Sequence, residues 1–183
     1  MTDLLRESPL ARFLDQQQLD VIRPFIREIS GLEGDLIEQG AMPRALYFLA
    51  DGSVQVRSAE RSVPLAQLDA PQVFGEMAFL TGGVASANVV ILKPVSGIEI
   101  EFEKMSELVK NEPDVGARVM TFLARTLAHR LATTNRHLNQ MARETRSEAL
   151  GLGEIEASQL DDGFSAEFAS VNLDEVWDAS FEL

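Results

Sequence analysis

The residues best suited to chemistry lie in segment 74–87. Gly75 lets a backbone approach a ligand closely and can start a short helix, whose free N–H groups attract an anion. Further along comes the small tripeptide Ala85-Ser86-Ala87, in which Ser86 offers a hydroxyl or its backbone N–H as a donor. The segment therefore predicts a turn that attracts an anion.

Three further parts of the chain must position this segment, and each has its own sequence pattern. Residues 9–27 carry apolar side chains at helical spacing, and Pro24 marks either a kink or a first turn there. Short apolar runs separated by glycines follow, and Asp51-Gly52 predicts a hairpin turn between two of them. The expected strand segments are 36–37, 46–49, 54–56, 63–65, 87–92 and 98–102. Residues 103–142 return to helical spacing. The order predicts an α+β fold, a sandwich or jelly-roll barrel with N-terminal helices and a long C-terminal helix.

The long helix, about residues 113–142, carries a heptad pattern. Mostly apolar or small residues recur at alternating spacings of four and three, which is an a/d seam: Met120, Ala124, Leu127, Leu131, Thr134, Leu138 and Met141. A second strip of Val119, Phe122 and Leu123 is expected to dock on the barrel. The distal half of the seam then needs a partner, so we predict a homodimer through this helix. The alternative is a helix packed within one chain, on the barrel or on the tail.

Several short motifs follow one another along the chain: Gly34-Asp35-Leu36-Ile37, Gly40, Leu46-Tyr47-Phe48-Leu49, Gly52 and Phe74-Gly75-Glu76-Met77-Ala78. Together they resemble the cyclic nucleotide-binding domain family, in its bacterial catabolite-activator type, over about residues 9–141. The resemblance implies a jelly-roll barrel in which segment 74–87, called the cassette below, binds the phosphate. It also implies that Glu76 contacts a ribose hydroxyl and that the segment 131–135 reaches the base.

The predicted ligand-binding residues combine the cassette with the long helix. They are Gly75, Glu76, Met77, Ala85, Ser86, Ala87, Thr134 and Asn135. Two of them have alternative roles. Glu76 can simply cap the short cassette helix, and Thr134 can be a polar seam residue that sets the register of a dimer.

One departure from the family pattern is Ala85, where the family carries an arginine. A guanidinium forks onto phosphate with two charge-assisted hydrogen bonds, and alanine offers nothing in their place. Removing one partner of a buried charge pair costs roughly 2–5 kcal/mol, so a micromolar site weakens to about the millimolar range. We therefore predict a degenerate site with a less anionic ligand or none. The alternative is a cyclic nucleotide sensor in which Arg44, Arg57 or Arg61 compensates.

The C-terminal tail, residues 143–183, differs in charge from the rest. The chain has a net charge of −13, and residues 147–183 hold ten of its 29 acidic residues and none of its 16 basic ones. Such a tail repels a phosphate backbone, so we expect no direct nucleic-acid binding and no helix-turn-helix domain. Aromatic and apolar residues alternate with the acids, and they predict a segment that docks on a protein partner or on its own body: Phe164, Phe168, Val176, Trp177 and Phe181. The alternative is a disordered terminus.

Composition limits the remaining function classes. The chain has no cysteine, and its two histidines, His129 and His137, lie on the long helix, so neither a nucleophile nor a metal site is indicated. No signal peptide or membrane-spanning run is visible, which predicts a soluble cytoplasmic protein. We expect two domains, 1–142 and 143–183, that form a non-catalytic regulatory module. A ligand-free protein–protein adaptor is the further alternative.

Overall fold

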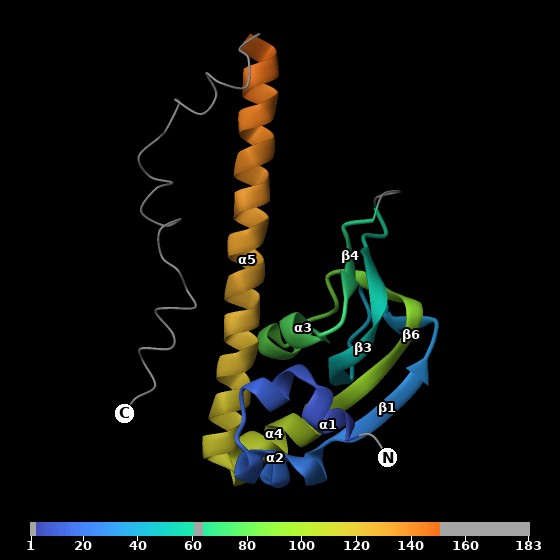
Figure 1. The fold of residues 1–183 in the computed structure, drawn as a ribbon, viewed down its shortest axis with the longest axis vertical. Helices are drawn as coiled ribbons and strands as arrows, with labels where there is room; N and C mark the ends of the chain where they lie inside the picture. The colour runs from blue at the N-terminus through green and yellow to red at the C-terminus, as the bar shows by residue number, and fades with distance from the viewer. Residues whose placement is uncertain (1–2, 61–63, 151–183) are drawn as a thin grey trace. The chain divides into compact units, whose positions relative to one another are not determined.

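The computed structural model describes residues 3–60 and 64–150, with the backbone alone for 144–150. The chain divides into two compact units, Met1–His129 and Arg130–Leu183. The helical elements are α1 (Leu4–Glu7), η1 (Pro9–Arg12), α2 (Gln16–Ile22), η2 (Arg23–Phe25), α3 (Glu76–Thr81), α4 (Phe102–Asn111) and α5 (Pro113–Leu150). The strands are β1 (Arg27–Leu32), β2 (Asp35–Ile37), β3 (Ala45–Arg57), β4 (Ala66–Asp69), β5 (Gln72–Phe74) and β6 (Asn88–Glu101). The predicted α+β class, with N-terminal helices and a long C-terminal helix, is confirmed (Figure 1).

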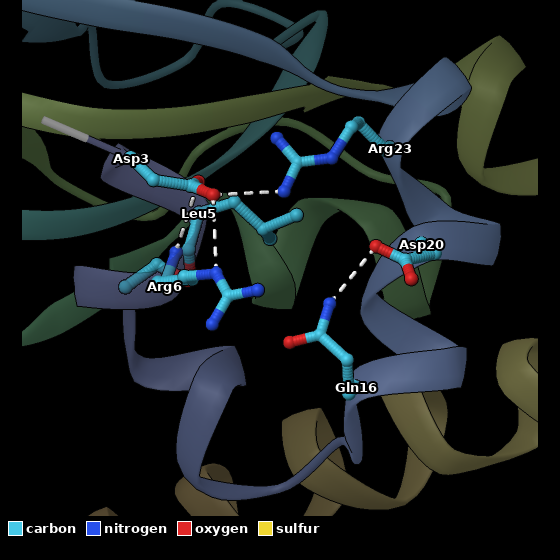
Figure 2. A network of polar contacts seen from close by, with 7 residues as sticks. Asp3, Leu5, Arg6, Gln16, Asp20 and Arg23 are labelled. Atoms are coloured by element: carbon cyan, nitrogen blue, oxygen red, sulfur yellow. Dashed lines mark hydrogen bonds and ion pairs between the residues drawn. The ribbon is translucent and has the colours of Figure 1, made fainter. Parts of the chain in front are cut away.

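The N-terminal helices are fixed by side-chain caps and one polar network. Asp3 caps α1 and also accepts a hydrogen bond of 2.8 Å from Arg23, which joins the start of α1 to η2 (Figure 2). Asp15 and Gln18 form a capping box at the start of α2, where two otherwise unpaired backbone N–H groups are satisfied. Pro24 lies in the first turn of η2, so it marks a new turn after α2 rather than a kink within it.

The six strands in the described part of the chain belong to one antiparallel sheet that is built around two long strands. β3 pairs with β6 along most of its length, and each long strand pairs with different short strands at its two ends. β5 pairs with the first half of β3 and β4 with the second half. β2 pairs with the first half of β6 and β1 with the second half. The long strands thus pass from one half of the sheet to the other, as the predicted barrel requires.

The predicted hairpin at Asp51-Gly52 is wrong. β3 continues through both residues, and its register with β6 shifts there, which makes an irregular, bulged pairing instead of a turn. Gly52 has φ +99°, and a Cβ at this position would lie 2.5 Å from the Pro94 carbonyl oxygen of β6. The glycine is therefore needed for close strand approach, and a local turn signal was misleading. The segments expected at 87–92 and 98–102 are likewise parts of one strand, β6.

Two apolar clusters pack on the sheet. The first, called the helical cluster, joins α1, η1, α2, α4 and the start of α5 to β3, β5 and β6; its members include Leu5, Ile22, Phe48 and Leu123. Figure 1 shows α1, α2 and α4 gathered beside the start of α5. The second, called the barrel cluster, lies among the strands and includes Val54, Phe74, Ala85 and Val89. Val119 and Leu123 are fully buried, so the predicted docking strip is confirmed.

Candidate ligand-binding site

The cassette begins with a glycine that no other residue replaces without strain. Gly75 has φ +87° and is the N-cap of α3. A Cβ at this position would lie 2.5 Å from the carbonyl oxygen of Ala45 on β3. α3 then starts at Glu76, as predicted, and the first N–H groups of the helix have no partner within it. The close approach of Gly75 to β3 holds this turn against the sheet.

Glu76 occupies the first turn of α3 and is 4% exposed. A carboxylate in this position is favoured by the N-terminal end of the helix dipole. Both predicted roles, contact with a ribose and capping of α3, need a carboxylate in this first turn, and the geometry of α3 fits either one. Met77 follows it and is half exposed, at 48%. Glu76 is therefore withdrawn from bulk water while its neighbour remains at the surface.

Ala85 lies in the barrel cluster and is 7% exposed. Its backbone N–H donates a hydrogen bond of 2.8 Å to the Ala41 carbonyl, and its carbonyl accepts one of 2.9 Å from the Gly40 N–H. The methyl group packs in the same cluster as Ile37 and Val89. The position at which the resemblance implies a guanidinium is thus apolar, buried and hydrogen-bonded through its backbone to the 40–41 loop.

The surface beside Ala85 is also apolar. Ser86 is exposed, and its hydroxyl donates to the Met77 sulfur at 3.7 Å, a weak interaction. Val84 and Met42 flank the hydrogen-bonded Ala85–Ala41 pair, and both are exposed. Ala87 is half-buried. The cassette therefore presents methionine and valine side chains next to the hydroxyl of Ser86.

The three arginines that could compensate for the missing guanidinium lie in different parts of the chain. On β3, Val54 and Val56 contact the barrel cluster, and alternation along the strand points Gln55 and Arg57 to the other face. The Arg57 guanidinium donates to the Gln55 side chain, in agreement with that direction. Arg44 is exposed and precedes β3. Arg61 lies outside the described residues.

A row of polar side chains crosses the sheet and was missed by sequence reasoning. Arg27 on β1 forms an ion pair with Glu99 on β6, with Nε to Oε1 at 2.7 Å and Nη2 to Oε1 at 2.5 Å. Glu99 is buried and lies opposite Tyr47 on β3, which in turn lies opposite Phe74 on β5. Burial and then the charge of Glu99 raise the pKa of Tyr47. Alternation in β6 identified a strand but not which glutamate is buried.

The remaining predicted residues lie on or beyond the distal part of α5. Thr134 and Asn135 belong to the second unit and are exposed, and their contact with a base remains a prediction. Within the seam, Met120 and Leu127 are half-buried, while Leu131, Leu138 and Met141 are well exposed. The tail residues Phe164, Phe168, Val176, Trp177 and Phe181 lie outside the described residues.

Among residues 3–60 and 64–150, no group of three or more histidine, cysteine or acidic side chains is arranged to hold a metal ion. His129 and His137 are both exposed. None of the helices in the described part of the chain is both long and apolar enough to cross a bilayer.

Comparison with known proteins agrees with this geometry. Residues 34–112 match the family described as the cyclic nucleotide-binding domain. The cAMP-activated global transcriptional regulator CRP of Pasteurella multocida is 31% identical over 111 residues, which are 58% of this chain and 51% of that protein. The solved catabolite activator protein of Thermus thermophilus is 27% identical with a TM-score of 0.58, over 75% of this chain and 64% of that one.

A third relative shows the fold alone. The regulatory subunit of a cAMP-independent protein kinase A from Trypanosoma brucei is 20% identical with a TM-score of 0.56, over 67% of this chain and 43% of that one. This chain spans less than two thirds of the length of each of the three proteins. Residues 34–112 of this chain are a cyclic nucleotide-binding domain, a regulatory domain with homologues among the CRP-type proteins.

Proposed function

We propose that this protein is a non-catalytic, dimeric regulatory module whose cassette no longer holds the phosphate of a cyclic nucleotide. The observation that carries the proposal is Ala85, which is buried among apolar side chains with both backbone groups hydrogen-bonded to the 40–41 loop. Neither a guanidinium nor a free N–H is available there for a phosphate. Regulation would pass through α5 and the acidic tail.

The size of the effect supports a change of ligand rather than a small loss of affinity. A missing partner of a desolvated charge pair costs roughly 2–5 kcal/mol, which is about 30-fold to several thousand-fold in affinity. The exposed Met77 and Val84 beside Ala85 add apolar surface where a phosphate would lie. An uncharged occupant, or none, suits this surface better than an anion does.

The names of the relatives do not decide the ligand. The Pasteurella relative is named as activated by cAMP, whereas the Trypanosoma protein with the same fold is named as independent of cAMP. A fold alone therefore does not establish a cyclic nucleotide ligand. The Pasteurella relative is also named as a transcriptional regulator. The excess of acidic residues in the present 183 residues argues against direct contact with DNA.

The proposed dimer rests on the distal part of α5. Leu131, Leu138 and Met141 are spaced as seam positions and are each more than half exposed. Exposed leucines and methionines at a/d spacing gain free energy when a second helix covers them. We include the tail as the segment that docks on a protein partner or on its own chain. The absence of cysteine fits a reducing compartment, so we place the protein in the cytoplasm.

Calorimetric titration with cyclic AMP and cyclic GMP tests the proposal. The wild type is expected to bind neither in the micromolar range, and Ala85→Arg is expected to gain affinity. Ala85→Met is the matched control, because it places a long side chain without the charge at the same position. Thermal melts of both variants establish that they are folded. Micromolar binding by the wild type would refute the degenerate site and support a sensor with compensating contacts.

A further inference from the structure

A cavity lies in the first unit, away from the cassette residues. It has a volume of about 230 Å³, and its apolar walls are Pro9, Phe13, Pro71, Val73 and Phe122. It is therefore bounded by η1, the turn before β5, β5 itself and α5. The polar residues that line it are Arg12, Gln72 and Thr126. None of the predicted ligand-binding residues takes part.

Two aromatic rings form one corner of the cavity. The ring centroids of Phe13 and Phe122 are 5.7 Å apart with an angle of 59° between the planes. An open aromatic corner of this kind accepts a further ring in an offset or edge-to-face arrangement. The volume is below the roughly 300–1,000 Å³ that drug-sized ligands occupy, so it suits a molecule with a single ring.

Positive charge is concentrated at this corner, although the whole protein is acidic. Arg12 lines the cavity, and its guanidinium forms no hydrogen bond or ion pair with any other described residue. The Arg125 guanidinium lies 5.0 Å from the centroid of the Phe13 ring. The acids nearest in sequence, Asp15 and Asp69, do not line the cavity. Asp15 accepts the Gln18 N–H as the cap of α2.

The other polar groups contribute less to ligand recognition. The Thr126 hydroxyl already donates to the Phe122 carbonyl at 3.0 Å. Apolar walls combined with one uncommitted guanidinium favour a ligand that is apolar at one end and anionic at the other. We propose that this cavity is a binding site for a small monocyclic carboxylate, which would pack its ring against Phe13 and Phe122 and place its carboxylate on Arg12.

The position of the cavity gives such a ligand a regulatory consequence. It would join η1 to α5, two elements of the helical cluster that are more than 100 residues apart in sequence. The third wall of the cavity, β5, leads directly into Gly75 and α3. A bound carboxylate would therefore stabilise the packing of the start of α5 and the strand that positions the cassette. This holds whether or not the cassette binds a nucleotide.

Proton–nitrogen NMR titration of the full chain with sodium benzoate tests the site. For a probe with so few atoms we expect a dissociation constant on the order of 1 mM. Chemical-shift changes should concentrate at residues 9–13, 71–73 and 122–126. Benzamide, which has the same ring and no charge, should bind about three- to fivefold more weakly, as expected for a partly exposed ion pair.

Three variants separate the parts of the proposal. Arg12→Ala should remove the difference between benzoate and benzamide, whereas Arg118→Ala, an exposed arginine of α5 that does not line the cavity, should preserve it. Thr126→Met should fill the cavity and abolish binding of both probes while the protein still melts cooperatively. Absence of saturable shifts, or shifts confined to residues 75–86, would overturn the proposal. So would an unchanged benzoate preference in Arg12→Ala.

Discussion

The helical cluster and the barrel cluster differ in how completely they are closed. Leu5, Ile22 and Leu123 of the helical cluster are fully buried and come from three separate helices. The barrel cluster is formed almost entirely by strands, and half-buried side chains such as Val56 and Ile91 surround it. The first cluster therefore carries most of the apolar burial, while the second borders the surface where a ligand would enter.

This difference explains how the cassette can change without loss of the fold. An alanine at position 85 completes an apolar cluster that is already lined by aliphatic side chains. The helices that cover the other face of β3 and β6 do not depend on that residue. Substitutions at the barrel cluster can thus alter ligand preference, whereas truncation in the helical cluster removes stability.

The largest expected effect comes from shortening a buried side chain of α5 in the helical cluster. Leu123 is 0% exposed and Leu131, two helical turns later, is 63% exposed. Leu123→Ala should lower the free energy of unfolding by about 2–5 kcal/mol, because a buried leucine leaves a cavity. Leu131→Ala should change it by about 0.5 kcal/mol or less at low protein concentration. Urea unfolding followed by circular dichroism measures both.

The same two variants also test the proposed dimer. Sedimentation equilibrium should show weaker self-association for Leu131→Ala than for the wild type, because Leu131 is a seam position. Equal losses of unfolding free energy in Leu123→Ala and Leu131→Ala at every protein concentration would contradict the contrast between the two parts of α5.

The second prediction concerns the turn that leads into the cassette. Gly75 and Gly82 both have positive φ, +87° and +64°, but only at Gly75 would a Cβ meet backbone atoms. Gly75→Ala should lower the free energy of unfolding by about 1–3 kcal/mol. The loss should be near the upper value, because the Ala45 carbonyl must also move. Gly82→Ala should cost about 1 kcal/mol. Chemical denaturation at pH 7 compares them, and equal costs would show that close approach to β3 is unimportant.

Much of the fold could be predicted from sequence, since glycine spacing, strand alternation and heptads are local patterns. The Asp51-Gly52 hairpin failed because a contact with β6, some forty residues away, overrides the local turn preference. Ala85 could be identified from its position in the motif, but its bonds to Gly40 and Ala41 could not. The cavity beside Phe13 and Phe122 could not be predicted from the sequence, because its walls come from three distant segments that share no motif.

A smaller effect is expected in the polar row of the barrel. Tyr47 is the only tyrosine of the chain, so absorbance at 295 nm during an alkaline titration reports its ionisation. Burial and the charge of Glu99 raise its pKa, and the charge of Arg27 lowers it. Glu99→Gln should therefore move the pKa of Tyr47 down, and Arg27→Met should move it up. Shifts in the same direction in both variants would contradict this arrangement.

The smallest expected effect is at the N-terminal network, on the outer side of the helical cluster. A hydrogen bond from Arg23 is the main cause of the lowered pKa of Asp3, and Arg6 adds to it (Figure 2). A carboxyl whose pKa is lower in the folded state adds stability above its unfolded pKa, and loses it as the pH falls through the folded value. Asp3→Asn should therefore be slightly less stable than the wild type at pH 7, and this difference should shrink as the pH falls below about 4. Urea midpoints at pH 7 and pH 3 measure this difference. A constant difference at both values would assign the contribution of Asp3 to helix capping rather than to charge.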